Sequence, residues 1–368
     1  NNAPCLNKVN NIKPIETTLT VIIPTYNEEK NIKNCLTALS KIKIPSSKFK
    51  ILILDDSSTD NTLKIANKCK EELFKDPSYI EIISSGERPK NKNWVGKNWA
   101  CYIASKKTKS QFILFIDADV IVEKYCIYNA LSKSFNEKVD LLSLAPKVNC
   151  NCLAEWMVQP IMTSLLMLGF PISDTNNPES KTAFAAGPFM LFRRDSYERI
   201  GGHEGTYNEI VEDLALAKKI KEENLNLNFL IGLEDISLNM YKDLNSLIEG
   251  WSKNWYLGLE KNIFKSFIAA IFVFSIYSMP WILLLGKLFK YMLNNFISID
   301  IYTFIFSLLG IILYGGKRYW LNYKFNIPYK FWFLNGIGGL VVIYISFSSI
   351  YKTLTGNNWT WKGRKLSN

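Results

Sequence analysis

The stretch Phe112-Ile-Leu-Phe-Ile-Asp-Ala-Asp119 is an apolar run that ends in two acids one residue apart. Its β-branched and aromatic residues predict a buried strand, and residues i and i+2 of a strand face the same side. Asp117 and Asp119 are therefore expected to point to one place beyond the strand's carboxyl end, where open α/β sheets hold ligands. Two carboxylates there suit Mg²⁺ or Mn²⁺, which keeps waters and recruits substrate phosphates. The alternative is a turn after a buried strand, with Asp119 as a helix cap.

Short apolar runs that alternate with amphipathic stretches surround this segment. The alternation predicts an α/β fold with a parallel, doubly wound sheet. Strands are expected over residues 19–24, 51–54, 79–83 and 112–116. We expect Asn27 to cap a helix that ends at Leu39, and Asp60 or Thr59 to cap one that ends at Leu73. Later amphipathic helices are expected over residues 209–223 and 243–259.

The net charge of +11 is concentrated at one end of the chain. The part of the chain after residue 262 contains eleven of the 44 Lys and Arg residues and a single acid, Asp300. A nucleic-acid-binding protein would carry its basic residues on the folded domain. Here they flank apolar runs, which is typical of membrane anchors, so we expect a lipid bilayer and no nucleic acid as partner.

Three apolar runs lie in this basic part, over residues 266–286, 301–316 and 331–351. The first and third approach the roughly 20 residues that cross a bilayer core, and the second is marginal. Tyr and Trp gather near their ends, as in an interfacial aromatic belt. An earlier apolar stretch, 157–170, contains Pro160 and is too short to span, so it is expected to lie at the interface or cover an acceptor. Buried core helices are the alternative for the three runs.

Four motifs follow one another along the chain: Val21-Ile-Ile-Pro-Thr-Tyr-Asn-Glu28, Ile53-Leu-Asp-Asp-Ser-Ser-Thr-Asp60, Phe115-Ile-Asp-Ala-Asp119 and Glu212-Asp213. In this order they resemble the family 2 glycosyltransferases with the GT-A fold. Further segments, over 93–100, 182–193, 200–203 and 361–364, resemble a membrane-associated branch, the hopene-associated and carotenoid-type glycosyltransferases. The resemblance implies an N-terminal tail (1–18), a Rossmann-like nucleotide-sugar-binding GT-A domain (19–262), and a transmembrane helical region with a basic C-terminal tail (263–368).

The resemblance also implies a nucleotide pocket at the carboxyl ends of the first two strands. It assigns the base and ribose of the donor to Pro24, Thr25, Asn27, Glu28 and Asp56. Carboxylates suit this role because they accept hydrogen bonds from ribose hydroxyls or a uracil N–H. A UDP-sugar is the expected donor. Asn27 and Asp56 as mere caps or turn formers are the alternative.

The diphosphate side of the donor is assigned to residues further along the chain. Asp119 would hold the divalent cation, with Asp117 on the same ion or on the ribose, so that charge on the leaving diphosphate is stabilised. Lys97 would meet the diphosphate as a point charge, unless it is an ordinary solvated lysine. Gly187 would let the backbone approach the donor sugar, and a bulge is the alternative.

Asp213 is the candidate general base, with Glu212 as its substitute. The acceptor hydroxyl must lose a proton as it attacks the anomeric carbon, and a positioned carboxylate takes it without a covalent intermediate. A first-turn carboxylate of a helix is favoured as the anion, which lowers its basicity, and partial desolvation by a lipid acceptor would compensate. Trp255 would line the acceptor site, or it packs at the membrane surface. His203, the single histidine, is expected to order a loop.

The resulting hypothesis is an inverting transfer of a hexose to a membrane lipid, such as a carotenoid, a hopanoid-like lipid or a glycerolipid. Cytosolic donors would place the catalytic domain at the cytoplasmic face of the cell inner, or thylakoid-like, membrane of a multi-pass protein. The alternatives are a processive polysaccharide synthase and a non-catalytic membrane scaffold. Residues 251–255 retain one residue, Trp255, of the Q/R-x-x-R-W pattern of processive synthases, which favours transfer of one sugar.

Overall fold

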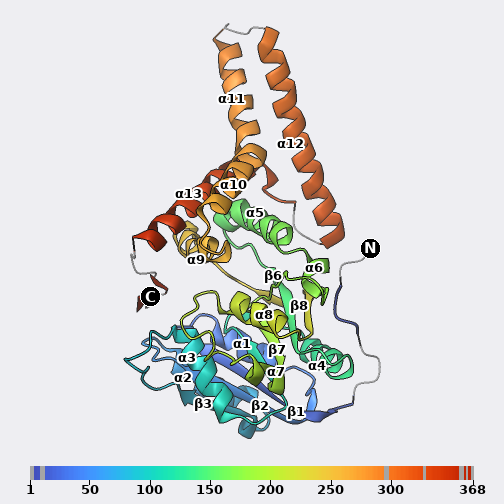
Figure 1. Ribbon diagram of the computed structural model, residues 1–368, viewed down its shortest axis with the longest axis vertical. Helices are drawn as coiled ribbons and strands as arrows, with labels where there is room; N and C mark the ends of the chain where they lie inside the picture. The colour runs from blue at the N-terminus through green and yellow to red at the C-terminus, as the bar shows by residue number, and fades with distance from the viewer. Residues whose placement is uncertain are drawn as a thin grey trace. The chain divides into compact units, whose positions relative to one another are not determined.

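The computed structural model describes residues 4–8, 13–293, 298–325, 329–355, 360–361 and 364–365. The chain divides into two compact units. The first consists of Asn1–Asn149, Gly169–Met240 and Thr360–Asn368, and the second of Cys150–Leu168 and Tyr241–Trp359. Each unit has its own architecture, shown in Figure 1.

A mixed sheet forms the centre of the first unit. Its strands among the described residues are β1 (Ile15–Thr25), β2 (Ser46–Asp55), β3 (Ile80–Ser84), β4 (Phe112–Ile116), β5 (Val120–Val122), β6 (Leu141–Val148), β7 (Phe189–Arg193) and β8 (Leu227–Leu238). The spatial order is β3-β2-β1-β4-β7-β6-β8-β5. The four strands expected from the sequence are confirmed, and they pair in parallel. A wholly parallel sheet was a wrong expectation, because β7 runs antiparallel to both β4 and β6, and β5 runs antiparallel to β8.

Helices cover both faces of this sheet, so a doubly covered α/β architecture is confirmed. The first unit contains α1 (Ile32–Leu39), α2 (Thr62–Leu73), α3 (Gly96–Lys107), α4 (Cys126–Asn136), α6 (Ile172–Asn176), α7 (Arg194–Arg199) and α8 (Glu212–Glu222). Side chains alternate along β1: Val21 and Ile23 pack with α1, α2 and α4, whereas Ile22 packs with α3 and α8. Burial on both faces explains why the parallel strands read as continuous apolar runs.

The cap of the first helix is not where the sequence predicts it. Asn27 has φ 52°, in the left-handed region, and its Oδ1 accepts a hydrogen bond from Thr59 N at 2.8 Å. The residue that precedes α1 is Asn31. The capping prediction for Asn27 is therefore wrong, since its side chain ties the β1 loop to the β2 loop. Asp60 Oδ1 does accept from Thr62 N, at 2.9 Å, at the start of α2.

The second unit is helical among its described residues. It contains α5 (Leu153–Gly169), α9 (Leu244–Gly258), α10 (Ile263–Val273), a π-helical turn η2 (Phe274–Ser278), α11 (Met279–Met292), α12 (Ser298–Phe325), a 3₁₀ turn η3 (Trp332–Leu334) and α13 (Asn335–Leu354). α11 and α12 lie side by side as a hairpin (Figure 1). α5 continues through Pro160. The C-terminal β9 (Thr360–Trp361) and β10 (Arg364–Lys365) pair antiparallel, and residues 362–363 of the segment 361–364 lie outside the described residues.

Two segments of the described chain are long and apolar enough to cross a membrane, judged by length and composition. They are Ile263–Met292, which contains the first apolar run, and Trp332–Leu354, which contains the third run from its second residue on. The marginal second run lies within α12 and does not meet the same measure. Large apolar side chains on these helices are exposed, including Phe264, Phe289 and Leu313.

Close helix packing in the second unit depends on the glycines of α13. A Cβ at Gly338 would clash with the Met157 carbonyl, and one at Gly339 would clash with Ser278 Oγ. Ser278 Oγ donates to the Gly336 carbonyl at 2.9 Å. The backbone of α13 therefore lies against the backbone of α5 and against the side chains at the end of η2.

Candidate active site

The two aspartates after β4 stand at the carboxyl ends of the parallel strands. Val120 N donates to the Asp117 carbonyl at 3.1 Å, which closes a tight turn, and both aspartates are half-buried. The buried Cys35 thiol of α1 has its pKa raised by burial and then by the negative charges of Asp119, Glu28 and Asp117. The acids of the β1 and β4 ends are thus close enough to act on the pKa of one buried thiol.

Lys97, in the first turn of α3, joins this edge to α8. Its Nζ lies 2.7 Å from Asp117 Oδ1 and 2.7 Å from Glu212 Oε1. Although burial opposes the charged form, these two carboxylates raise the pKa of Lys97 well above its ordinary value. Lys97 is therefore a cation paired with two acids, although its side chain is partly exposed.

Asp213 lies beside Glu212 in the first turn of α8. Its Oδ2 accepts a hydrogen bond from Gly187 N at 2.9 Å, and its Oδ1 accepts one from Leu214 N at 2.8 Å. Burial, followed by the charge of Glu212, raises the pKa of Asp213 to about 6. Part of the desolvation that we expected from a lipid acceptor thus comes from the protein itself, in which Asp213 is half-buried.

Gly187 stands where Asp213 and Lys97 meet. A Cβ at this position would lie 3.0 Å from Asp213 Oδ2 and 3.3 Å from Lys97 Nζ. The backbone of Gly187 therefore fits between a carboxylate and an ammonium because it has no side chain. The structure brings together five of the residues singled out by the sequence: Lys97, Asp117, Gly187, Glu212 and Asp213.

Asp56 holds a separate position at the end of β2. Its Oδ2 pairs with Arg88 Nη2 at 2.9 Å, and its Oδ1 accepts from Ser85 Oγ at 3.1 Å. A side chain at Gly96 would clash with this carboxylate. Sequence reasoning missed Arg88 as the partner of Asp56. Its position after the third strand, on the same edge of the sheet, was the available signal.

The remaining nucleotide-pocket candidates cluster in the loop after β1. Pro24 and Thr25 end the strand, and Thr25 Oγ1 donates to the Leu54 carbonyl at 3.1 Å. Glu28 Oε2 accepts from Asn31 Nδ2 at 2.9 Å, and Glu28 N donates to Thr62 Oγ1 at 2.7 Å. These contacts order the loop beside Asp56.

Two further candidates, Trp255 and His203, have contacts of their own. Trp255 is in the second unit, where its Nε1 donates to Ser346 Oγ at 2.9 Å across the α9–α13 contact. His203 is buried, and its Nδ1 lies 2.8 Å from Tyr197 Oη. Burial lowers the pKa of His203 to about 3, so the ring is neutral at physiological pH and orders its loop.

The carboxylates of Asp117 and Asp119 fit a divalent cation whose remaining ligands come from the substrate and water. Among the ranges that the structure describes, no group of three or more His, Cys, Asp or Glu side chains could hold a metal ion by itself. Asp117 and Asp119 supply two carboxylates at one turn. Mg²⁺ commonly binds through one or two carboxylates and takes its other ligands from phosphates and water, so this arrangement is compatible with it.

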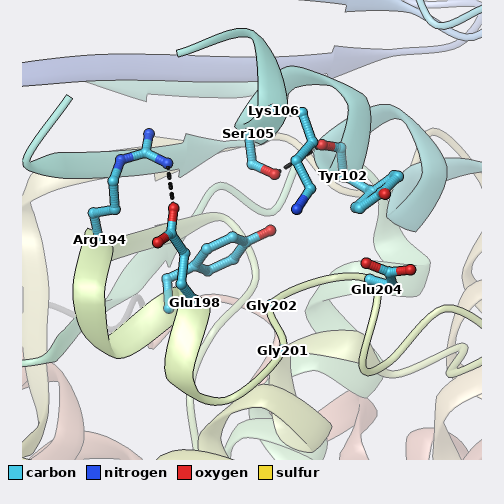
Figure 2. A pocket seen from close by; sticks show the side chains of 9 residues that line it. Tyr102, Ser105, Lys106, Arg194, Glu198, Gly201, Gly202 and Glu204 are labelled. Carbon is cyan, nitrogen blue, oxygen red and sulfur yellow. Dashed lines mark hydrogen bonds and ion pairs between the residues drawn. The ribbon is translucent and has the colours of Figure 1, made fainter. Parts of the chain in front are cut away.

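A pocket of about 140 Å³ lies elsewhere in the first unit, as Figure 2 shows. It is formed at the last turns of α3 by Tyr102 and Lys106, with Arg194 and Glu198 of α7, which form an ion pair at 3.0 Å. Lys97 is in the first turn of the same helix. The pocket is therefore not part of the site that contains Lys97, Asp117 and Glu212.

The fold and the cluster of Lys97, Asp117, Gly187, Glu212 and Asp213 define a GT-A-like α/β domain. Residues 20–201 match the family model described as glycosyl transferase family 2, and this part of the chain is a family 2 glycosyltransferase domain. The 4,4'-diaponeurosporenoate glycosyltransferases of Staphylococcus haemolyticus (strain JCSC1435) and Staphylococcus aureus (strain MRSA252) are each 26% identical over 243 residues. The matched residues make up 65% of this chain and 61% of the length of these curated relatives.

A solved structure shares the fold. It is a mannosyltransferase from Pyrobaculum calidifontis in complex with GDP-Man and Mn²⁺, with a TM-score of 0.53 and 16% identity. The likeness covers 97% of this chain and 90% of that one. At this identity the likeness supports the GT-A-like fold.

Proposed function

We propose that this protein is an inverting, cation-dependent glycosyltransferase that moves a hexose from a nucleotide-diphosphate sugar to a hydroxyl of a membrane lipid. The observation that carries the proposal is the position of Asp213. Gly187 N holds its carboxylate in place. Lys97 connects Glu212, the residue before Asp213, to Asp117 at the donor edge, which is the carboxyl-end edge of the parallel strands. A raised pKa suits a carboxylate that must accept a proton near neutral pH.

The relatives support both the reaction class and the acceptor class. The family 2 domain covers the residues of the donor edge. The matched curated relatives are named as glycosyltransferases of 4,4'-diaponeurosporenoate, a carotenoid-type molecule, so a lipid-type acceptor is the proposed class here. GDP-Man and Mn²⁺ in the related fold support a nucleotide sugar and a divalent cation. UDP-sugar remains our proposed donor.

The side chains of the cluster divide the chemistry between them. Asp213 accepts the proton of the acceptor hydroxyl while that oxygen forms a bond to the anomeric carbon. The bond from this carbon to the diphosphate oxygen breaks, and the diphosphate leaves with the electron pair. The hydrogen bonds from Gly187 N and Leu214 N hold Asp213 in one orientation throughout. A single displacement of this kind inverts the anomeric carbon.

Asp119 and Asp117 are the proposed ligands of a Mg²⁺ or Mn²⁺ ion. A bound cation would supply positive charge at the diphosphate. Pro24, Thr25, Asn27, Glu28 and Asp56 are the proposed walls of the nucleotide pocket. Arg88 orients the Asp56 carboxylate within it, at 2.9 Å.

The membrane assignment rests on the helices of the second unit. Residues 263–368 are proposed to anchor the protein in the cell inner, or thylakoid-like, membrane, with the catalytic domain (19–262) in the cytoplasm. The two long apolar segments and their exposed large side chains support this anchoring. Lys265 and Lys290, near the ends of the first segment, are placed as interfacial basic residues usually are. Trp255 is proposed to lie near the acceptor.

The test is transfer by purified full-length protein in detergent. The protein is incubated with labelled UDP-hexose or GDP-hexose, Mn²⁺ and a membrane lipid extract. Label in one new lipid species, with the opposite anomeric configuration to the donor, is expected. Label in long polymers would indicate a processive synthase, and no label with either donor would contradict the proposal. A lipid comparison of cells with and without the gene then identifies the acceptor.

A further inference from the structure

One lysine connects two parts of the site that have different tasks. Lys97 Nζ lies at 2.7 Å from both Asp117 Oδ1 and Glu212 Oε1. Asp117 belongs to the donor edge, whereas Glu212 precedes the base Asp213. The side chains of Lys97 and Asp117 are 32% and 30% exposed, and that of Glu212 is 9% exposed. The contact to Asp117 is thus accessible to an arriving ligand, and the contact to Glu212 is enclosed.

An ammonium and a divalent cation exclude each other at one carboxylate. Like charges a few ångströms apart repel each other at the effective dielectric constants of protein surfaces. Lys97 therefore lowers the affinity of Asp117 for a cation as long as it stays in contact with Oδ1. Glu212 offers Lys97 a second carboxylate at the same distance, so the ammonium keeps a partner if it leaves Asp117.

The residue after Lys97 fixes the segment that leads into α8. Asn98 is fully buried, and its Nδ2 donates to the carbonyls of Thr206 and Glu209, at 2.6 and 2.9 Å. Val95 N donates to the Tyr207 carbonyl at 2.9 Å. The start of α3 is thus joined to the start of α8 by an ion pair and by three hydrogen bonds.

We infer that Lys97 is an internal counter-ion that neutralises Asp117 while the donor site is empty, and that retains Glu212 beside the base when Asp117 turns to the donor. This inference rests on the proposed function and makes Lys97 a positioning residue. It differs from the expectation that Lys97 holds the diphosphate, because the ammonium keeps its contact with Glu212 in both states.

The test measures Mn²⁺ binding to the full-length protein without any donor, by isothermal titration calorimetry. Lys97→Gln keeps hydrogen-bonding capacity but removes the charge, so Mn²⁺ should bind more tightly, on the order of tenfold, while hexose transfer falls. Lys97→Arg keeps the charge and should bind Mn²⁺ as the wild type does. Lys106→Gln, at the exposed far end of α3, is the matched control and should change neither quantity.

Equal or weaker Mn²⁺ binding by folded Lys97→Gln would overturn the inference. Unchanged Mn²⁺ binding together with weaker UDP binding would indicate a direct diphosphate contact instead. If the variant does not fold, the wild type decides: Mn²⁺ must bind more tightly in the presence of UDP than in its absence, and equal affinity overturns the inference. Hexose transfer by the wild type is measured in parallel, so failure of the inference is distinguishable from failure of the proposed function.

Discussion

Asp213 Oδ2 and Gly187 N are 2.9 Å apart and join the first turn of α8 to the loop before β7. This hydrogen bond fixes the orientation of a carboxylate that the protein also desolvates. The hydrogen-bond donor is the backbone N–H of Gly187. The bond therefore holds Asp213 in position and also favours its negative charge. The proposed role of Asp213 as the base depends on this one contact.

Gly187→Ala should disrupt that contact. The new Cβ would lie 3.0 Å from Asp213 Oδ2 and 3.3 Å from Lys97 Nζ, so the Asp213 carboxylate must shift. We expect kcat to fall about 10²-fold, because small misplacements of catalytic groups are costly. The measurement is steady-state hexose transfer. Gly169→Ala, where a Cβ meets no neighbour within 4 Å, is the control, and equal loss in both variants would argue against a specific effect.

The rate of transfer should depend on pH through Asp213. A base acts in its ionised form, and burial with the charge of Glu212 raises the pKa of Asp213 to about 6. Transfer should therefore be slow below this pH and rise to a plateau as the pH increases through it. The measurement is kcat/KM for the acceptor at saturating donor, with UDP binding followed in parallel. A flat acid limb would show that no group of this pKa serves as base.

The strand β4 and its two aspartates could be predicted because both signals are local. An apolar run gives the strand, and its abrupt end gives the position of the acids. The antiparallel direction of β7 could not be predicted, since direction depends on partners far away in the sequence. The capping prediction for Asn27 failed for a related reason. Its side chain accepts a hydrogen bond from Thr59 of the next loop and does not cap the helix that follows it.

Removal of the cation should stop transfer without unfolding the protein. With two carboxylates at the turn and the remaining ligands supplied by phosphates and water, the ion is expected to be exchangeable. EDTA should abolish transfer and added Mn²⁺ or Mg²⁺ should restore it. Asp119→Ala should lose both the activity and its metal dependence, with an unchanged circular dichroism spectrum. Full activity in this variant would exclude the proposed ligand.

The helical unit should be sensitive to substitution at Gly338. A Cβ there would clash with the Met157 carbonyl of α5, and backbone cannot move aside cheaply. Gly338→Val should lower the free energy of unfolding by about 1–3 kcal/mol, as overpacking commonly does. Thermal unfolding in detergent measures this. Gly286→Val, where a Cβ meets nothing within 4 Å, should be much milder, and an equal shift would count against close α5–α13 packing.

The ion pairs of Lys97 show where sequence reasoning about the site ends. A Lys after a Gly in a predicted helix start indicates a cation near the strand ends. It does not reveal which acids approach it, because Glu212 reaches Lys97 only through the fold of the whole first unit. Arg88 was missed for the same reason, since its role depends on Asp56 in the neighbouring loop.

The most direct test of the central claim is the rate of hexose transfer by Asp213→Asn relative to wild type, at saturating donor and cation. Asn keeps the size of the side chain and an oxygen for the hydrogen bond from Gly187 N, but it cannot accept the acceptor's proton. We expect kcat to fall about 10²- to 10⁴-fold, with UDP and Mn²⁺ affinities close to those of the wild type. A variant that transfers hexose at the wild-type rate would contradict it.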